Sequence, residues 1–267
     1  MKVIFMGKHK RSAVRALHHL TERDCELAAV VAPPPDVDAH AEQRLDLAAE
    51  AAGLPLTNDD DLYRALAEPG DSELELDGTD LVVSFLFWKR ILAPLIELPA
   101  IACLNFHPAP LPDLRGLGGY NVAIVEGFPE WGVSAHVVDE DLDTGDLVAV
   151  DRFPIDPASE TALSLDLKSQ ARLYDLFRSV IDDLLDGRAL PRSPQGPGRY
   201  VSRAEFEALR RVAPDDPPEL VERKVRAFWY PPHPGATIDV GGRTLTLVDE
   251  ARLRELAMLY RRAGALP

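Results

Sequence analysis

Two short apolar runs separated by one amphipathic segment constrain the fold of this chain more than any other feature. Val3–Gly7 and Leu27–Ala32 each have the length and the continuous hydrophobicity of a buried strand. Between them, apolar residues recur at helical spacing at Val14, Leu17 and Leu20. A strand, a helix and a second strand at this separation predict a right-handed parallel βαβ unit.

The alternation of strands and helices continues to about residue 190. The further predicted strands are Asp80–Leu86, Ile101–Asn105, Gly132–Val138 and Leu147–Phe153. The further predicted helices are Ala39–Ala52, Leu62–Ala67, Lys89–Glu97 and Ala162–Leu185. The last two strands have no helix between them, so we expect an antiparallel pair there. The pattern predicts an α/β fold with an open, mostly parallel, Rossmann-like sheet and helices on both faces.

A change of composition marks a boundary after this region. Pro191–Gly198 is rich in proline and glycine, which is typical of a linker. Beyond it, Gly241 and Gly242 lie between two strand-like runs and predict a hairpin turn. We therefore predict two domains, a large one at residues 1–190 and a small C-terminal α+β subdomain at residues 191–267.

The charge balance limits the classes of molecule that this chain is expected to bind. Asp and Glu number 44 against 29 Lys and Arg, for a formal net charge of −15. Proteins that bind nucleic acid normally carry clustered basic residues, so a nucleic-acid substrate is disfavoured, whereas a small anionic ligand held by a few arginines is compatible. No apolar run is long enough to cross a bilayer and no secretion signal is recognisable, so we expect a cytoplasmic protein with no membrane association.

Two classes of site are disfavoured by the motifs that the chain does not carry. The histidines and the two cysteines, Cys25 and Cys103, have no metal-ligand spacing, so no metal site is predicted. The turn after the first strand has one glycine, Gly7, where a dinucleotide-binding unit has three. An NAD-dependent oxidoreductase is therefore disfavoured.

The segment Leu104–Gly116 carries the strongest chemical signal. It reads L-N-F-H-P-A-P-L-P-D-L-R-G, so the predicted strand ends at Asn105, and His107 follows two residues later. On an extended chain these side chains project to the same side, at the edge where open α/β sheets bind ligands. Prolines follow at every second position and stiffen the loop. The plainer alternative is that both side chains only satisfy loop carbonyls.

A carboxylate is predicted to join this pair. Asp143 lies in D-E-D-L-D-T-G-D, after the strand at Gly132–Val138. It precedes Thr144 and Gly145, a turn-forming pair that can direct the carboxylate inward. The alternative for this acidic cluster is a solvated loop tip.

Together these blocks resemble the family of 10-formyltetrahydrofolate-dependent formyltransferases. The matching residues are Asn105, His107, Pro108, Leu111, Pro112, Arg115 and Gly116, followed by Leu142–Gly145. The resemblance implies N10-formyltetrahydrofolate as the formyl donor and an amine as the acceptor. It also implies that Asn105, His107 and Asp143 are the catalytic residues.

The resemblance further implies an apolar pterin pocket. It maps to Phe85–Leu92, after the third predicted strand, and to Val138–Asp143, in the loop of the catalytic aspartate. The implied contacts are Phe87, Trp88, Ile91, Leu92, Val138, Asp139 and Asp141. For Phe87 and Trp88, ordinary core packing is an equal alternative.

Two branches of the family differ in their acceptor. The continuation L-G-G-Y-N and the acidic charge favour the branch that acts on nucleotide-linked amino sugars, dTDP- or UDP-linked, over methionyl-tRNA formyltransferases. The implied acceptor contacts are Arg115, Gly116, Tyr120 and Asn121. Other small-molecule or carrier-bound amines, a folate hydrolase and a ligand-binding sensor remain alternatives. A homodimer through the C-terminal part is also possible.

Overall fold

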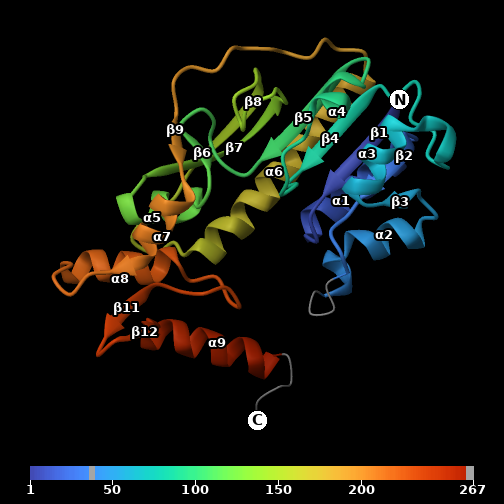
Figure 1. Cartoon of the computed structure of the whole chain (residues 1–267). Helices are drawn as coiled ribbons and strands as arrows, with labels where there is room; N and C mark the ends of the chain where they lie inside the picture. The colour runs from blue at the N-terminus through green and yellow to red at the C-terminus, as the bar shows by residue number, and fades with distance from the viewer. Residues whose placement is uncertain (36–39, 263–267) are drawn as a thin grey trace. The chain divides into compact units, whose positions relative to one another are not determined.

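The computed structural model describes residues 1–35 and 40–262. Seven strands form one sheet in the order β3-β2-β1-β4-β5-β7-β8 (Figure 1). Their bounds are β1 Lys2–Gly7, β2 Glu26–Val31, β3 Leu56–Thr57, β4 Leu81–Phe85, β5 Ala102–His107, β7 Glu130–Val137 and β8 Leu147–Pro154.

Helices connect these strands and follow them. Their bounds are α1 Arg11–Glu22, α2 Leu45–Ala51, α3 Asp59–Ala67, α4 Ala93–Glu97, α5 Gly119–Glu126, α6 Ala162–Leu185, α7 Arg203–Arg210, α8 Pro218–Ala227 and α9 Glu250–Arg262. Two 3₁₀ turns are η1 Ala41–Gln43 and η2 Pro69–Asp71. The smaller strands are β6 Leu114–Gly116, β9 Arg199–Val201, β10 Arg211–Val212, β11 Thr237–Val240 and β12 Arg243–Thr246.

The pairing of the large sheet confirms the predicted fold class. Strand β1 is parallel to β2 and to β4, and β4 is parallel to β5. Strand β7 is antiparallel to β5. The strand order changes direction between β1 and β4, and the carboxyl ends of the strands at such a switch point are where open α/β sheets bind ligands.

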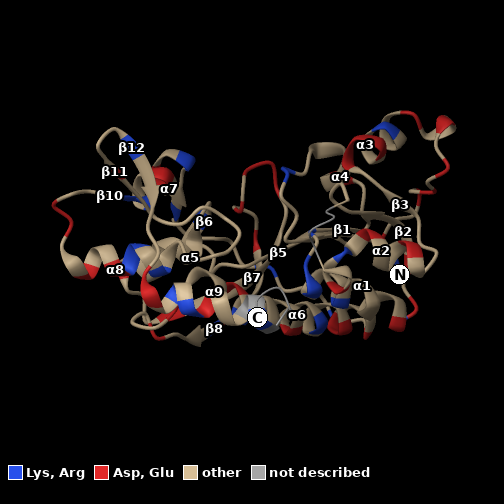
Figure 2. Ribbon diagram, turned by 90° about the horizontal axis from the view of Figure 1, so that it is seen from below, with Lys and Arg blue, Asp and Glu red and all other residues tan. Residues whose placement is uncertain are grey.

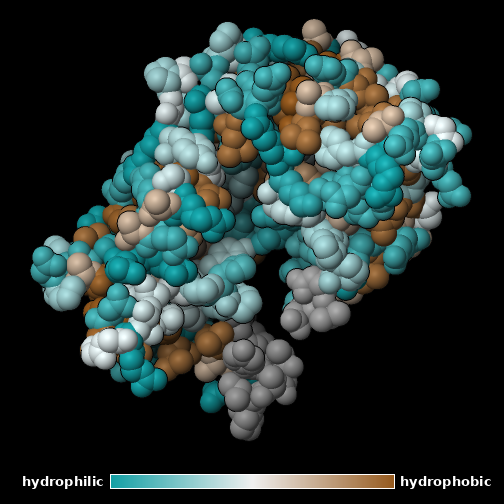
Figure 3. Space-filling view, in the orientation of Figure 1, coloured by the Kyte–Doolittle hydropathy of each residue, from teal (hydrophilic) through white to brown (hydrophobic). Residues whose placement is uncertain are grey.

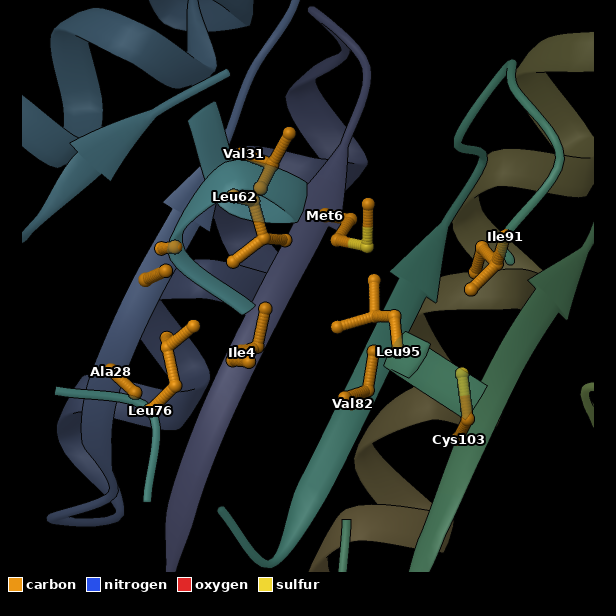
Figure 4. Packing of buried hydrophobic residues seen from close by; sticks show 12 residues of the cluster. Ile4, Met6, Ala28, Val31, Leu62, Leu76, Val82, Ile91, Leu95 and Cys103 are labelled. Carbon is orange, nitrogen blue, oxygen red and sulfur yellow. The ribbon is translucent and has the colours of Figure 1, made fainter. Parts of the chain in front are cut away.

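One face of the sheet packs against α3 and α4. Figure 4 shows Leu62 of α3 and Leu95 of α4 against the side chains of Ile4, Met6 and Val82. The same cluster includes Cys103 of β5, and all of these side chains are nearly inaccessible to solvent. Burial of this apolar surface, at about 25 cal/mol per Å², holds the helices on the sheet.

The opposite face of the sheet packs against α6 through aromatic rings. Phe177 of α6 lies 5.0 Å from Phe106 and 5.6 Å from Phe85, between ring centroids, in edge-to-face arrangements. Phe5 of β1 joins the group at 6.5 Å from Phe177. Helices therefore cover both faces, as the sequence predicts.

The chain forms two compact units. The first contains residues 1–115, 132–152 and 169–199, and the second contains residues 116–131, 153–168 and 200–267. The division at residue 190 inferred from the sequence stays a prediction of domain boundaries. The second unit includes a three-stranded sheet in the order β10-β11-β12, in which β11 and β12 form the predicted hairpin.

Three predicted helices differ in their bounds from those observed. The helix predicted at Leu62–Ala67 is α3, which begins three residues earlier, at Asp59. The helix predicted at Ala39–Ala52 is a 3₁₀ turn followed by α2, and its predicted start at residue 39 lies outside the described residues. The helix predicted at Lys89–Glu97 is the five-residue α4, because Leu92 is extended and Pro94 lies in the first turn. Proline suits a helix start, since its missing N–H has no partner there in any case.

The charges are mixed along the elements. Figure 2 shows Lys and Arg interleaved with Asp and Glu along α6 and α8. The face in Figure 3 is mostly hydrophilic, with hydrophobic residues in small patches. Among residues 1–35 and 40–262, no helix is both long and apolar enough to span a bilayer.

Candidate active site

Three polar side chains lie in register across adjacent strands at the end of the face covered by α3 and α4. Ser84 of β4 is opposite Asn105 of β5, and Asn105 is opposite His136 of β7. Residues directly opposite in a sheet share a face, and Ser84 and Asn105 continue the apolar rows that contain Val82 and Cys103. The apolar face therefore becomes polar where β4 and β5 end.

Hydrogen bonds fix the orientation of the Asn105 amide. Ser84 Oγ donates to Asn105 Oδ1 at 2.7 Å, and Asn105 Nδ2 lies 3.0 Å from His136 Nε2. His136 Nδ1 lies 2.8 Å from the carbonyl oxygen of Val137. A carbonyl can only accept, so Nδ1 carries the hydrogen and Nε2 of the neutral ring accepts from Asn105.

Burial keeps His136 neutral. Its residue is 2% exposed, and desolvation, followed by the nearby His107, lowers the pKa of His136 from 6.5 to about 4. At neutral pH His136 is therefore an acceptor toward Asn105 and not a cation.

The other two predicted catalytic residues lie beside this row. His107 Nδ1 is 3.5 Å from Asp143 Oδ1, and His136 Nε2 is 3.8 Å from the same oxygen. Asp143 is buried, and His107 keeps 15% of its side chain exposed. The structure thus brings Asn105, His107 and Asp143 together around His136, within the first unit.

The loop that carries Asp143 has an unusual backbone conformation. Asp143 has a φ of 58°, in the left-handed region that non-glycine residues seldom adopt. A Cβ on Gly145 would lie 1.9 Å from the carbonyl oxygen of Val137, so only glycine fits there. The amide of Val137 donates to Asp146 O at 2.8 Å and closes the loop.

Ser134 of β7 holds the proline-rich loop after His107. Its Oγ donates to Ala109 O at 2.8 Å and accepts from the amide of Leu111 at 2.9 Å. Ser134 is fully buried and opposite His107 in the sheet. The loop is therefore anchored at two points just after the histidine.

The predicted pterin contacts gather near the same face. Ile91 is buried in the cluster that contains Cys103, and Phe87 and Val138 pack against that cluster. Trp88 and Leu92 are 37% and 51% exposed, respectively, and the ring of Trp88 lies 4.5 Å from that of Phe87. Asp139 accepts from Thr144 Oγ1 at 2.7 Å, while Asp141 is exposed. The role of these seven residues toward a cofactor stays a prediction.

The residues predicted to contact the amine substrate have neighbours within the protein itself. Arg115, in the first unit, donates through one terminal nitrogen to Gln195 Oε1 at 2.9 Å and to Gly196 O at 3.1 Å. In the second unit, Asn121 Nδ2 donates to Ala227 O at 2.6 Å.

Gly116 and Tyr120 also have structural neighbours in the second unit. A Cβ on Gly116 would lie 2.6 Å from Val201 O, and the Tyr120 ring lies 5.4 Å from that of Trp131. The role of all four residues toward an acceptor stays a prediction.

Sequence reasoning missed Ser84 and His136. The signal for His136 is that Gly132, Ser134 and His136 alternate with apolar residues and so share one face of a strand. Only the register of β7 on β5 identifies Asn105 as the partner of His136. For Ser84, a polar residue at the end of an otherwise apolar strand was the available signal.

Comparisons with known proteins identify the family. The family model described as formyl transferase matches residues 1–181. The methionyl-tRNA formyltransferase of Paracoccus denitrificans is 31% identical over 254 residues, covering 93% of this chain and 81% of that protein. The corresponding protein of Myxococcus xanthus is 33% identical over 177 residues, covering 66% of this chain but 56% of its own length.

Solved structures share the fold. A 4-N formyltransferase from Francisella tularensis matches with a TM-score of 0.73 at 20% identity, covering 93% of this chain and 97% of that one. An N-formyltransferase from Helicobacter canadensis, solved with folinic acid and dTDP-3-aminofucose, matches with a TM-score of 0.70 at 18% identity, covering 91% and 85%. With the family model covering residues 1–181, the resemblance is confirmed, and the chain belongs to the formyl transferase family and is an N-formyltransferase.

Proposed function

We propose that this N-formyltransferase transfers a formyl group from N10-formyltetrahydrofolate to the primary amine of a nucleotide-linked amino sugar, dTDP- or UDP-linked. The observation that carries the proposal is the group formed by Asn105, His107 and Asp143 around the neutral His136. These residues supply hydrogen-bond donors beside a carboxylate, which is what acyl transfer to an amine requires.

Asn105 is the proposed hydrogen-bond donor to the formyl oxygen. When bound, the formyl-folate supplies a formyl carbon whose oxygen takes up negative charge as the amine nitrogen attacks. One hydrogen of Asn105 Nδ2 is committed to His136 Nε2, and within the described residues the other has no protein acceptor. That hydrogen suits the developing oxyanion, a contact worth about 3 kcal/mol.

His107 and Asp143 are the proposed acid–base pair. Asp143 Oδ1 faces His107 Nδ1, so the carboxylate orients the ring and compensates positive charge on it. With its other nitrogen, His107 donates to the same developing charge. Asp143 also assists removal of the amine proton, directly or through water.

The surroundings fit a folate donor. The site lies at the carboxyl ends of β4 and β5, where Ile91 belongs to the apolar cluster on the same face of the sheet, Phe87 packs against that cluster and the nearby Leu92 is 51% exposed. We propose these three, with Trp88 and the loop residues Val138, Asp139 and Asp141, as the folate contacts. A flat pterin ring needs such an apolar slot with nearby backbone donors and acceptors.

Two observations support an amino-sugar acceptor. The structural relatives include the Helicobacter canadensis enzyme solved with dTDP-3-aminofucose. The net charge of −15, with basic residues interleaved with acidic ones, is poorly suited to a tRNA. Arg115, Gly116, Tyr120 and Asn121 are the proposed acceptor contacts, with the guanidinium of Arg115 as the candidate for a diphosphate.

A second candidate acceptor is methionyl-tRNA. The 31% identity to the Paracoccus denitrificans methionyl-tRNA formyltransferase, over 93% of this chain, favours it. The chemistry at Asn105, His107 and Asp143 would be the same, and only the acceptor would differ.

The test is to incubate the protein with N10-formyltetrahydrofolate and a panel of dTDP- and UDP-linked amino sugars, in parallel with methionyl-tRNA. We expect formylated amino sugar by mass spectrometry and release of tetrahydrofolate. His107→Ala should lower the rate by orders of magnitude, whereas His18→Ala, at an exposed position on α1, should leave it unchanged. Formylation of methionyl-tRNA alone would overturn the proposed acceptor. Release of tetrahydrofolate without any amine acceptor would indicate a hydrolase.

A further inference from the structure

The proline- and glycine-rich segment at residues 191–199, here called the strap, contacts both loops of the candidate active site. Ser193 exchanges two backbone hydrogen bonds with Leu147, at 2.8 and 2.9 Å, just after the loop that carries Asp143. A Cβ on Gly198 would lie 1.8 Å from Pro112 O, in the loop that follows His107. A sequence that predicts a linker therefore forms a bridge within the first unit.

Gln195 makes the most specific contacts of the strap. Its Nε2 donates to Asp143 O at 3.1 Å and to Gly145 O at 2.7 Å. Its Oε1 accepts from Arg115 at 2.9 Å. Both hydrogens of the Gln195 amide are therefore donated to backbone carbonyls on either side of Thr144, and its oxygen faces the guanidinium of Arg115.

Arg115 determines which way this amide points. A guanidinium can only donate, so the oxygen of Gln195 must face Arg115 and the nitrogen must face the loop. Arg115 also donates to Gly196 O at 3.1 Å, so it forms a second hydrogen bond to the strap. The two donors of Gln195 are thereby held toward the Asp143 loop.

The Asp143 loop needs such support. Its left-handed φ of 58° is a conformation that persists only when the surrounding structure holds it. We propose that Gln195 is a positioning residue for the formyl transfer reaction: through the carbonyls of Asp143 and Gly145 it holds the Asp143 carboxylate beside His107. The inference rests on the proposed function, in which Asp143 acts on His107.

The first test replaces Gln195 by Glu. The carboxylate has no hydrogen to give to the two carbonyls, but it keeps the size of Gln and can still accept from Arg115. We expect kcat for formyl transfer to fall about 10- to 100-fold, with KM within about threefold, because a small misplacement of a catalytic group costs rate and not binding. Gln195→Ala should behave similarly.

Arg192→Ala is the matched control. Arg192 also lies in the strap and also donates to a backbone carbonyl, that of Ile101 at 3.2 Å, but Ile101 directly precedes β5 and is not in the Asp143 loop. The Arg192→Ala variant should have the same kcat as the wild type. A fall in kcat equal to that of Gln195→Glu would show that any weakening of the strap suffices, and would overturn the assignment to Gln195.

A double-mutant cycle separates positioning from general stability. In an Asp143→Asn background, Gln195→Glu should lower kcat no further, because the group that it positions is already lost. A fall of the same size in both backgrounds would overturn the proposal. The loss of stability, measured by thermal unfolding, should instead be similar in both backgrounds.

An acceptor-independent measurement keeps this inference distinct from the proposed function. Hydrogen exchange of a peptide covering residues 138–146 should be faster in Gln195→Glu than in the wild type or in Arg192→Ala. If no acceptor in the panel is formylated, the proposed function fails while this measurement still tests the contact. Unchanged exchange in Gln195→Glu would overturn the positioning role even in an active enzyme.

Discussion

Replacing His136 with Gln should make the protein less sensitive to acid. In the folded protein His136 is buried, and its pKa is lowered to about 4, whereas in the unfolded chain the imidazole has its ordinary value of 6.5. As the pH falls below 6.5, the unfolded chain takes up a proton on this ring and the folded protein does not. Stability is therefore lost as the pH falls from about 6.5 to about 4.

The size of this loss follows from the two pKa values. The contribution of His136 to the free energy of unfolding falls by about 2 kcal/mol between pH 7.5 and pH 5, and by about 3 kcal/mol at pH 4. Gln offers a carbonyl oxygen in place of Nε2, so it can still accept from Asn105 Nδ2, but it does not titrate. Groups that do not interact with His136 contribute equally to both proteins, so their contributions cancel when the two proteins are compared at each pH.

The assay is urea unfolding followed by circular dichroism at pH 7.5, 5 and 4. We expect His136→Gln to be no more stable than the wild type at pH 7.5. Between pH 7.5 and pH 5, its free energy of unfolding should rise by about 2 kcal/mol relative to that of the wild type. His18→Gln, which removes an exposed imidazole, should follow the wild type. If the difference between the wild type and His136→Gln stays constant from pH 7.5 to 4, His136 is not held neutral, and the orientation assigned to the Asn105 amide loses its basis.

Three further substitutions test the candidate site. Asn105→Asp places an acceptor opposite His136 Nε2 and removes the proposed oxyanion donor, so kcat/KM for tetrahydrofolate release should fall about 100- to 1,000-fold; activity within fivefold of the wild type would contradict this role. Ser84→Ala removes one hydrogen bond to Asn105 Oδ1, worth about 1 kcal/mol, and the same assay should show a fall of about fivefold, not a complete loss. Gly145→Ala puts a methyl group against the carbonyl of Val137 and should lower stability by about 1–3 kcal/mol, seen as a lower Tm. Gly70→Ala is the control, because a Cβ there would meet no atom within 4 Å and the backbone of Gly70 is not left-handed.

Much of the fold was predictable because its signals are local. The apolar runs at β1 and β2 and the long helix α6 follow directly from hydrophobic periodicity, and α6 begins and ends at the predicted residues. The strand predicted at Ile101–Asn105 is β5, which continues to His107, two residues further than predicted. The position of Asn105 and His107 near the edge of the sheet was nevertheless predictable. Helix α4 was predicted too long because the pattern does not show where Pro94 permits a helix to begin.

The neighbours of the catalytic residues were not predictable. Ser84 and His136 reach Asn105 only through the register of three strands, and a shift of one residue would turn His136 to the other face. Gln195 lies 52 residues from Asp143 in the sequence, and its contact depends on the path of a segment without regular structure. Such long-range pairs follow from the tertiary structure and not from local sequence preference.

The contacts of the strap have a consequence for the design of chimeric enzymes. A chimera that exchanges the C-terminal segment needs a junction, and the composition of this chain favours one near residue 190. A junction there would bring in a foreign residue at position 195 and sever the bonds from Gln195 to the carbonyls of Asp143 and Gly145. A junction after Arg199 would keep those bonds and the pairing of Ser193 with Leu147 intact. Recombination libraries built on this chain should therefore retain more catalytic rate with the later crossover than with the earlier one.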